Sequence, residues 1–135
     1  MDGTGFDATV VDVDTIPWDQ TASDGTRYAV LTGRRDAPGE AFAYAFAIPA
    51  GFWDPPHVHS TDAHVTVIRG ALHLGFGIRL DTAAARVLRA GESIVVPGGA
   101  AHFDGSDEDT VIVGTAVGPW WTRYVDEHGV EIAGA

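Results

Sequence analysis

The stretch GFWDPPHVHSTDAHVTVIRG, residues 51–70, contains His57, His59 and His64, half of the six histidines in the chain. His57 and His59 are separated by one residue, and residues i and i+2 of a β-strand lie on the same face. Both imidazoles can therefore reach one point, where Zn, Cu, Fe, Ni or, less selectively, Mn can be bound. The pair predicts a metal site on a strand, although two histidines with this spacing also occur by chance.

The sequence around this stretch has the pattern of short strands separated by turns. Residues 40–48 alternate, with Phe42, Tyr44, Phe46 and Ile48 on one face and alanines on the other. Alanine favours a helix, but the period of two and the aromatic residues favour a strand. Further strands are predicted over residues 7–16, 26–34, 63–68, 71–76, 85–90, 92–97 and 110–117, and a last strand followed by a loose end is predicted in the tail from residue 118.

Length and composition agree with a single domain over residues 1–135. The chain is 45% hydrophobic, which is enough for one core of ordinary size. Its 17 glycines and 7 prolines favour many short strands over long helices. We therefore predict an all-β fold, an antiparallel barrel or sandwich.

Composition also excludes several classes of partner and site. The net charge of −11 repels nucleic acid and anionic membranes, so neither partner is expected, and no apolar run has the length of a membrane span. Without cysteine, a transition metal must be bound by histidine, carboxylate or water. The acidic N-terminus lacks the features of a signal peptide, and we expect a cytoplasmic protein.

A further histidine, His102, closes a second segment, GESIVVPGGAAH, in which it follows a predicted strand and a Pro-Gly turn. The two segments resemble the two motifs of the cupin family. The first family motif reads Gly, five residues, His-x-His, three or four residues, Glu, six residues and Gly. The positions that match it here are Gly51, His57, His59, Ala63 and Gly70, with Ala63 in the place of the Glu.

The second family motif reads Gly, five residues, Pro-x-Gly, two residues, His, three residues and Asn. Its counterparts here are Gly91, Pro97, Gly99 and His102, with Ser106 in the place of the Asn. The runs HVTVIRGALHLGFG and GPWWTRYV also resemble small bacterial single-domain cupins. The order and spacing of both motifs make this resemblance specific.

The resemblance implies a double-stranded β-helix, or jelly-roll barrel, with one divalent transition metal inside, which is Fe, Zn, Ni or Mn. The implied ligands are His57, His59, His102 and the Glu that Ala63 replaces, and alanine has no lone pair to offer. A three-His centre leaves a coordination position for water or substrate. In the alternative, the site has decayed and holds metal weakly or not at all.

Neither Asp62 nor His64 is expected to replace the missing carboxylate. Adjacent strand residues face opposite ways, so both should point outward if Ala63 points inward. Only a β-bulge would reverse this arrangement. We therefore expect His64 on the barrel exterior or at an interface.

Two candidate catalytic groups lie outside the motifs. His73 is a candidate base if its small-residue neighbours line the cavity, and otherwise it is a half-exposed strand histidine. Tyr44 is the second candidate, because a buried hydroxyl needs a partner. The candidate substrate-binding residues are Phe46, Phe52, Trp53 and Ala63, with ordinary core packing as the alternative for Phe46.

Trp120 and Trp121 are adjacent, so one of them should face inward and the other outward. An outward Trp is typical of an interface, and we predict a homodimer contact there. His128 is expected at the surface. The acidic residues that follow His102 are interpreted as a solvated loop, and they are Asp104, Asp107, Glu108 and Asp109.

Two functions remain open at this point. The first is a metalloenzyme that acts on a small organic molecule, such as a secondary metabolite, by dioxygenation or by non-redox cyclase, isomerase or lyase chemistry. Because no second carboxylate occupies a motif position, acid–base chemistry would depend on metal-bound water. The second function is that of a non-catalytic ligand-binding or sensor protein with a degenerate metal site. Three retained histidines favour the enzyme, since buried imidazoles without partners are unfavourable.

Overall fold

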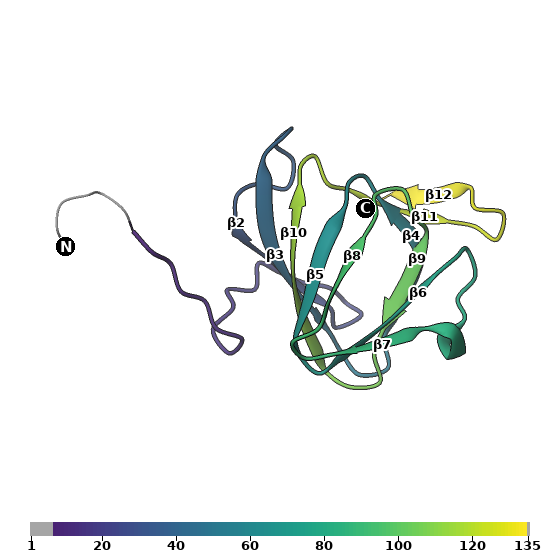
Figure 1. Cartoon of the computed structure of the whole chain (residues 1–135), viewed down its shortest axis with the longest axis horizontal. Coiled ribbons are helices and arrows are strands. Elements are labelled where there is room, and N and C mark those ends of the chain that lie inside the picture. The colour runs from purple at the N-terminus through teal and green to yellow at the C-terminus, as the bar shows by residue number, and fades with distance from the viewer. Residues whose placement is uncertain (1–6, 135) are drawn as a thin grey trace.

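The computed structural model describes residues 7–134, which form two antiparallel six-stranded sheets that face each other as a barrel (Figure 1). The first sheet has the order β1 (Gln20–Thr21), β2 (Arg27–Thr32), β3 (Ala41–Ile48), β10 (Thr110–Val117), β5 (Ala63–Arg69), β8 (Ser93–Val96). The second has the order β12 (Glu131–Gly134), β11 (Thr122–Val125), β4 (Trp53–His59), β9 (His102–Gly105), β6 (Ala71–Phe76), β7 (Arg86–Arg89). The predicted all-β barrel is thus confirmed.

The alternation predicted for residues 40–48 is confirmed in β3. Phe42, Tyr44 and Ile48 are buried in the main core between the two sheets, and Phe46 packs against it. Ala45 and Ala47 of the opposite face are buried as well, because a second cluster that includes Ile16 covers this part of the outside of the first sheet. Small side chains on that face let the N-terminal segment pack close to the strand.

The strand predicted over residues 7–16 is wrong. The segment has no strand pairing in the described chain, and Asp12 instead organises a turn. Its carboxylate accepts the backbone N–H of Asp14 at 2.8 Å, and its carbonyl accepts that of Thr15 at 3.0 Å. Val10 is 89% exposed, so the valine pattern does not reflect burial on one face of a sheet.

The tail and the segment after His102 also differ from the prediction. The tail forms a hairpin of β11 and β12 instead of one strand and a loose end. Residues 102–105, at the end of the second motif, form β9, and residues 82–84 form a single 3₁₀ turn, η1. Within residues 7–134, no helix has both the length and the apolar character needed to cross a membrane.

Ser106, which stands where the family has Asn, joins three segments at the end of the barrel. Its side chain is fully buried. The hydroxyl donates to the carbonyl of Ala71 at 2.6 Å and accepts the backbone N–H of Glu108 at 3.1 Å. It also lies 2.9 Å from the hydroxyl of Thr110, which begins β10. Serine therefore holds the starts of β6 and β10 together without the longer amide side chain.

We expect Ser106→Ala to lower the free energy of unfolding by about 1–3 kcal/mol, because it leaves buried polar groups without a partner. Urea unfolding followed by circular dichroism measures the change. Ser93→Ala, the same substitution at an exposed strand position, is the matched control and should change stability by less than about 0.5 kcal/mol. Equal effects of the two substitutions would contradict this role of Ser106.

Candidate metal centre

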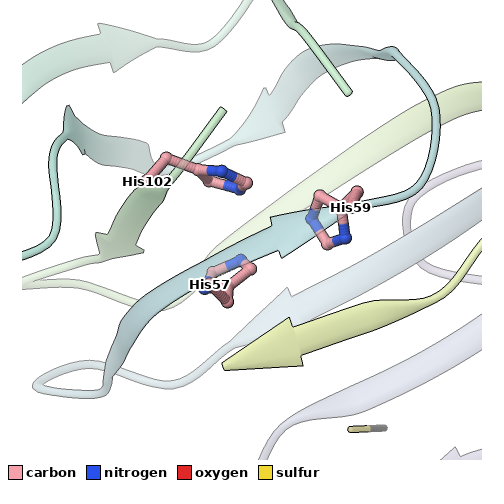
Figure 2. Close-up of side chains that lie close together, drawn as sticks. All are labelled: His57, His59 and His102. Carbon is pink, nitrogen blue, oxygen red and sulfur yellow. The ribbon is translucent and has the colours of Figure 1, made fainter. Parts of the chain in front are cut away.

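The structure brings His57, His59 and His102 together. β4 and β9 are neighbours, and His57 is paired directly with His102 across them. The imidazole centroids of these two residues are 4.2 Å apart, and each lies 5.0 Å from the centroid of His59. One possible ligand atom from each residue lies within 4.8 Å of the other two, so the three form a candidate metal-binding cluster (Figure 2).

The Nδ1 atom of each imidazole is held by a hydrogen-bonding partner. Nδ1 of His57 lies 2.7 Å from the carbonyl of Pro55, and Nδ1 of His102 lies 3.0 Å from the carbonyl of Ala100. A carbonyl only accepts, so both contacts require Nδ1–H, and in the neutral form of each ring this leaves Nε2 without a proton. Nδ1 of His59 lies 3.0 Å from the hydroxyl of Thr122. This arrangement fixes ring orientation as outer partners of metal-bound histidines do.

Burial keeps two of the imidazoles neutral. It lowers the pKa of His59 to about 2, and the neighbouring histidines lower it further. Burial and the neighbouring His57 lower the pKa of His102 to about 4. Metal binding requires neutral imidazoles, so protons do not compete for these two ligands at neutral pH.

The positions around the missing Glu face as the sequence predicts. Ala63 is 1% exposed and lines the cavity beside the histidines, so the family's carboxylate position does point inward. His64, the next residue of β5, is exposed on the outside. Asp62 is also exposed, and its carboxylate accepts the backbone N–H of Gly98 at 2.8 Å.

A cavity of about 270 Å³ opens beside the three histidines. Tyr44, Phe46, Phe52 and Ala63 line it, together with Trp120. Part of the wall is aliphatic, formed by Val65, Leu72, Leu74, Val96 and Ile112. The rest is mostly polar or charged, and it includes Gln20, Asp24, Arg27, Tyr28 and Arg35. The cavity therefore suits a small organic molecule that has both apolar and polar parts.

Trp53 and His73 lie together outside this cavity. Both residues pair with Gly105, and the ring of Trp53 occupies the space that a side chain on that glycine would need. The ring of His73 meets the ring of Trp53 edge-on at a centroid distance of 5.8 Å. Because Leu72 and Leu74 face the cavity, His73 faces away from it, and neither His73 nor Trp53 lines the cavity.

A β-bulge explains the orientation of Trp53. Asp54 pairs with Asp104, and His57 pairs with His102. Between these two pairs β4 advances by three residues, whereas β9 advances by only two. The extra residue falls at Pro55 and Pro56, and it turns the Asp54 side chain to the same side as His57. Trp53, the neighbour of Asp54, is therefore turned outward.

Asp54 and Asp104 lie close to His57 in the cavity wall, and neither carboxylate is expected there from the sequence. Asp104 was assigned to a solvated loop, but it belongs to β9 and lines the cavity with Asp54. Its spacing from His102 is the same i, i+2 spacing that singled out His57 and His59, so the sequence did carry that signal. Asp54 could not be placed this way, because the bulge breaks the alternation.

The two carboxylates have different surroundings. Asp54 accepts a hydrogen bond of 2.7 Å from the hydroxyl of Tyr124, whereas Oδ1 of Asp104 is buried without a hydrogen-bond partner in the described chain. Burial raises the pKa of Asp104 to about 7, although the nearby His57 opposes the shift. Burial likewise raises the pKa of Asp54, and it raises the pKa of Tyr124 above its usual range.

Asp104→Asn should stabilise the metal-free protein at high pH. The folded carboxyl has a pKa of about 7, against 3.8 for the ordinary side chain. Between these values the folded state keeps a proton that the unfolded chain has released. This contribution to stability is therefore fully present below pH 3.8 and is lost as the pH rises through 7.

Asn is neutral at every pH, so the stability of Asp104→Asn relative to wild type should rise between pH 4 and pH 8. Urea unfolding in the presence of chelator measures the difference. Asp107→Asn alters a side chain that is 81% exposed and serves as the control, for which no trend is expected. If the free energies of unfolding of wild type and Asp104→Asn depend on pH in the same way, the raised pKa of the buried carboxyl would be contradicted.

The two adjacent tryptophans face in opposite senses, as predicted. Trp120 is buried, and its ring stacks on that of His59 at a centroid distance of 4.2 Å. Trp121 is half-buried, with the guanidinium of Arg123 4.0 Å from its ring centroid. The homodimer contact at Trp121 stays a prediction. His128 is exposed, as expected.

Comparison with known proteins identifies a family for this chain. A family model described as cupin matches residues 35–117. Among curated proteins, the chain is similar to germin-like proteins 3-5 and 3-6 of Oryza sativa subsp. japonica, with 41% identity over 70 residues. The match covers 47% of this chain and 31% of each relative, so the chain matches less than a third of their length.

Solved structures share the fold at low identity. A putative acetylacetone dioxygenase from Methylibium petroleiphilum PM1 has a TM-score of 0.70 at 17% identity, over 99% of this chain and 92% of that one. An acetylacetone dioxygenase from Acinetobacter johnsonii has a TM-score of 0.70 at 15% identity, over 98% and 86%. A cupin-like protein from Thermotoga maritima MSB8 has a TM-score of 0.65 at 18% identity, over 81% and 85%. These likenesses establish the fold alone.

Proposed function

Because the chain belongs to the cupin family, we propose that it is a metalloenzyme acting on a small organic molecule inside the barrel. One divalent transition metal, which is Fe, Zn, Ni or Mn, would be bound by His57, His59 and His102. The observation that carries the proposal is the set of three converging imidazoles whose Nδ1 atoms are already engaged. Two of them present unprotonated Nε2 atoms, which fit a divalent transition metal.

The metal would supply Lewis acidity, and iron would add dioxygen chemistry. The neighbouring protein groups would bind and orient the substrate. The ring of Trp120 stacks on the ring of His59. The small side chain of Ala63 leaves room beside the histidines that a larger side chain would fill. A substrate close to the histidines would thus contact both aliphatic and polar side chains of the wall.

Tyr44 is the protein group we propose as a hydrogen-bond or proton donor to the substrate. Its ring is buried at the cavity wall between those of Tyr28 and Trp120. Burial raises the pKa of Tyr44 above its usual range, so its hydroxyl stays protonated at neutral pH. A protonated hydroxyl in an apolar wall suits an oxygen atom of the substrate.

Two further polar groups support a substrate that contains oxygen. The hydroxyl of Tyr28 and the indole nitrogen of Trp120 are buried without a hydrogen-bond partner in the part of the chain that the structure describes. Both residues line the cavity, and the guanidinium of Arg35 lies over both rings. Buried donors without partners are unfavourable, and a carbonyl or carboxylate of a ligand would satisfy them.

Dioxygenation and non-redox cyclase, isomerase or lyase chemistry both remain within the proposal. The acetylacetone dioxygenases of the same fold support dioxygenation. A cytoplasmic location and a homodimer belong to the proposal as well. The second candidate function is a non-catalytic ligand-binding or sensor protein, and the observation that favours it is Ala63 in the place of the family's Glu.

We expect near-stoichiometric metal in protein purified without a tag or chelator, measured by elemental analysis. His57→Ala should lose most of it, because one of three ligands is removed. His64→Ala is the matched control, since it alters an exposed histidine seven residues after His57, and it should retain the metal. Metal absent from wild type even after reconstitution would leave the ligand-binding function.

Iron-loaded protein should consume dioxygen when a small oxidisable compound is added, with 1,3-dicarbonyl compounds as the first panel. An oxygen electrode measures the rate, and zinc-loaded protein is the control for which no consumption is expected. Tyr44→Phe should lower the rate by about 10–100-fold if the hydroxyl donates to the substrate. If the protein binds compounds of the panel but no metal-loaded form converts them, the result would favour a ligand-binding protein instead.

A further inference from the structure

We propose that the cavity binds a carboxylate group of its ligand beside Arg35, and that the substrate is therefore a small organic acid. The carboxylate would lie against the guanidinium of Arg35, with the hydroxyl of Tyr28 and the indole nitrogen of Trp120 as neighbouring donors. The inference rests on the proposed function, because the acid would occupy the same cavity beside the histidines. It adds the chemical class of the substrate and the residue that selects it.

Hydrogen bonds to the backbone fix the position of Arg35. The residue lies in the loop between β2 and β3, and its side chain lines the cavity. Its carbonyl accepts the backbone N–H of Trp120 at 2.9 Å, and its Nε donates to the carbonyl of Trp120, also at 2.9 Å. Gly118 ties down the end of the same loop through backbone bonds of 2.9 Å with Gly39 and Glu40. The guanidinium is therefore placed at the cavity wall before any ligand binds.

The guanidinium of Arg35 has hydrogen-bonding capacity to spare. It carries five N–H groups, and the bond to the Trp120 carbonyl uses the one on Nε. No carboxylate in the described part of the chain forms an ion pair with it. Two N–H groups of a guanidinium match the two oxygens of a carboxylate, and such bonds are stronger than those between neutral groups. An arginine without an acidic partner at a cavity wall therefore suits an acid.

Two neutral donors lie next to this guanidinium. Its central carbon is 5.5 Å from the ring centroid of Tyr28 and 5.3 Å from that of Trp120. Burial raises the pKa of Tyr28, and the positive charge of Arg35 opposes the rise. The Tyr28 hydroxyl and the Trp120 indole nitrogen are buried without a hydrogen-bond partner among residues 7–134, and Trp120 as a whole is 7% exposed. Buried donors of this kind favour a group that only accepts, such as an ionised carboxylate.

The carboxylates of the cavity wall are engaged elsewhere. Asp54 and Asp104 lie 3.7 and 3.8 Å from ring nitrogens of His57. Asp24 accepts the backbone N–H of Thr26 at 2.9 Å and its hydroxyl at 2.6 Å. The charge of the guanidinium is therefore available to a ligand.

The guanidinium approaches the histidines from the side of His59. The ring of Trp120 lies next to Arg35 and stacks on the ring of His59 at a centroid distance of 4.2 Å. A small acid held at Arg35 would thus be one aromatic ring away from the histidine cluster. Its remaining atoms would lie beside the proposed metal.

The test compares benzoate with benzamide, which has nearly the same shape but no charge. Each compound is titrated into the full-length protein after metal removal, so that no ion competes for the carboxylate. Binding is followed by NMR through the indole N–H resonance of Trp120, which the variant Trp120→Phe identifies. We expect wild type to bind benzoate about 10-fold or more tightly than benzamide. Arg35→Gln should reduce this ratio to about one, because benzoate alone uses the charge.

The ratio of the two affinities separates recognition from structure. A variant that only loosens the loop would weaken both probes alike and leave the ratio unchanged. Arg34→Gln removes the same charge from an exposed neighbour and is the matched control, for which the wild-type ratio is expected. Arg35→Lys keeps the charge without the planar fork and should give an intermediate ratio. If Arg35→Gln does not fold, Tyr28→Phe is titrated instead and should lower the ratio by about 3-fold.

Equal affinities of wild type for benzoate and benzamide would overturn the inference, and so would an unchanged ratio in Arg35→Gln. Inorganic phosphate is the third probe, and binding of phosphate that depends on Arg35 and is tighter than that of benzoate would overturn the assignment to a carboxylate. Failure of the proposed function is distinguishable, because wild type then binds no zinc even after reconstitution. When only the inference fails, wild type and Arg35→Gln bind zinc equally and neither prefers benzoate.

Discussion

The bulged pairing of β4 with β9 is the constraint on which the site depends. It places His57 opposite His102, and the extra residue at Pro55 and Pro56 places Asp54 opposite Asp104. Four polar side chains thereby face one side of two neighbouring strands. The same bulge supplies the Pro55 carbonyl that orients His57. A regular pairing would turn Asp54 out of the cavity and Trp53 into it.

The cavity concentrates groups whose burial is unfavourable unless a partner is present. The pKa of His59 and that of His102 are lowered, while the pKa of Asp104 is raised, and burial is the largest cause in each case. Each shift favours the uncharged form of its group. A divalent ion bound by the histidines would satisfy the imidazoles and would favour the charged form of the nearby carboxylate, because it places positive charge inside the barrel. The barrel walls supply rigidity, since residues on paired strands cannot easily move apart.

Much of the fold and part of the site could be predicted from the sequence. The alternation in β3 and the spacing of the two motifs identified the barrel and the three histidines, because a period of two is a direct consequence of strand geometry. The prediction for residues 7–16 failed because valines there resemble a strand while the Asp12 turn prevents pairing. His73 and Trp53 were considered for the cavity because sequence parity does not reveal which face of a strand is inside.

The two carboxylates show where strand periodicity stops being informative. Asp104 obeys the alternation from His102 but stands at the start of an acidic run, and that composition suggested a loop. Asp54 is hidden by a bulge that only the pairing of two distant segments reveals. A departure from the family's motif, such as Ala63, is therefore best judged with the whole cavity wall in view.

The measurement that tests the account most directly is the anomalous diffraction of metal-loaded crystals at the absorption edge of the bound metal. The account predicts one peak inside the barrel, at about 2.0–2.2 Å from Nε2 of His57, His59 and His102. A peak elsewhere, or none at this position in protein with full metal content, would contradict it.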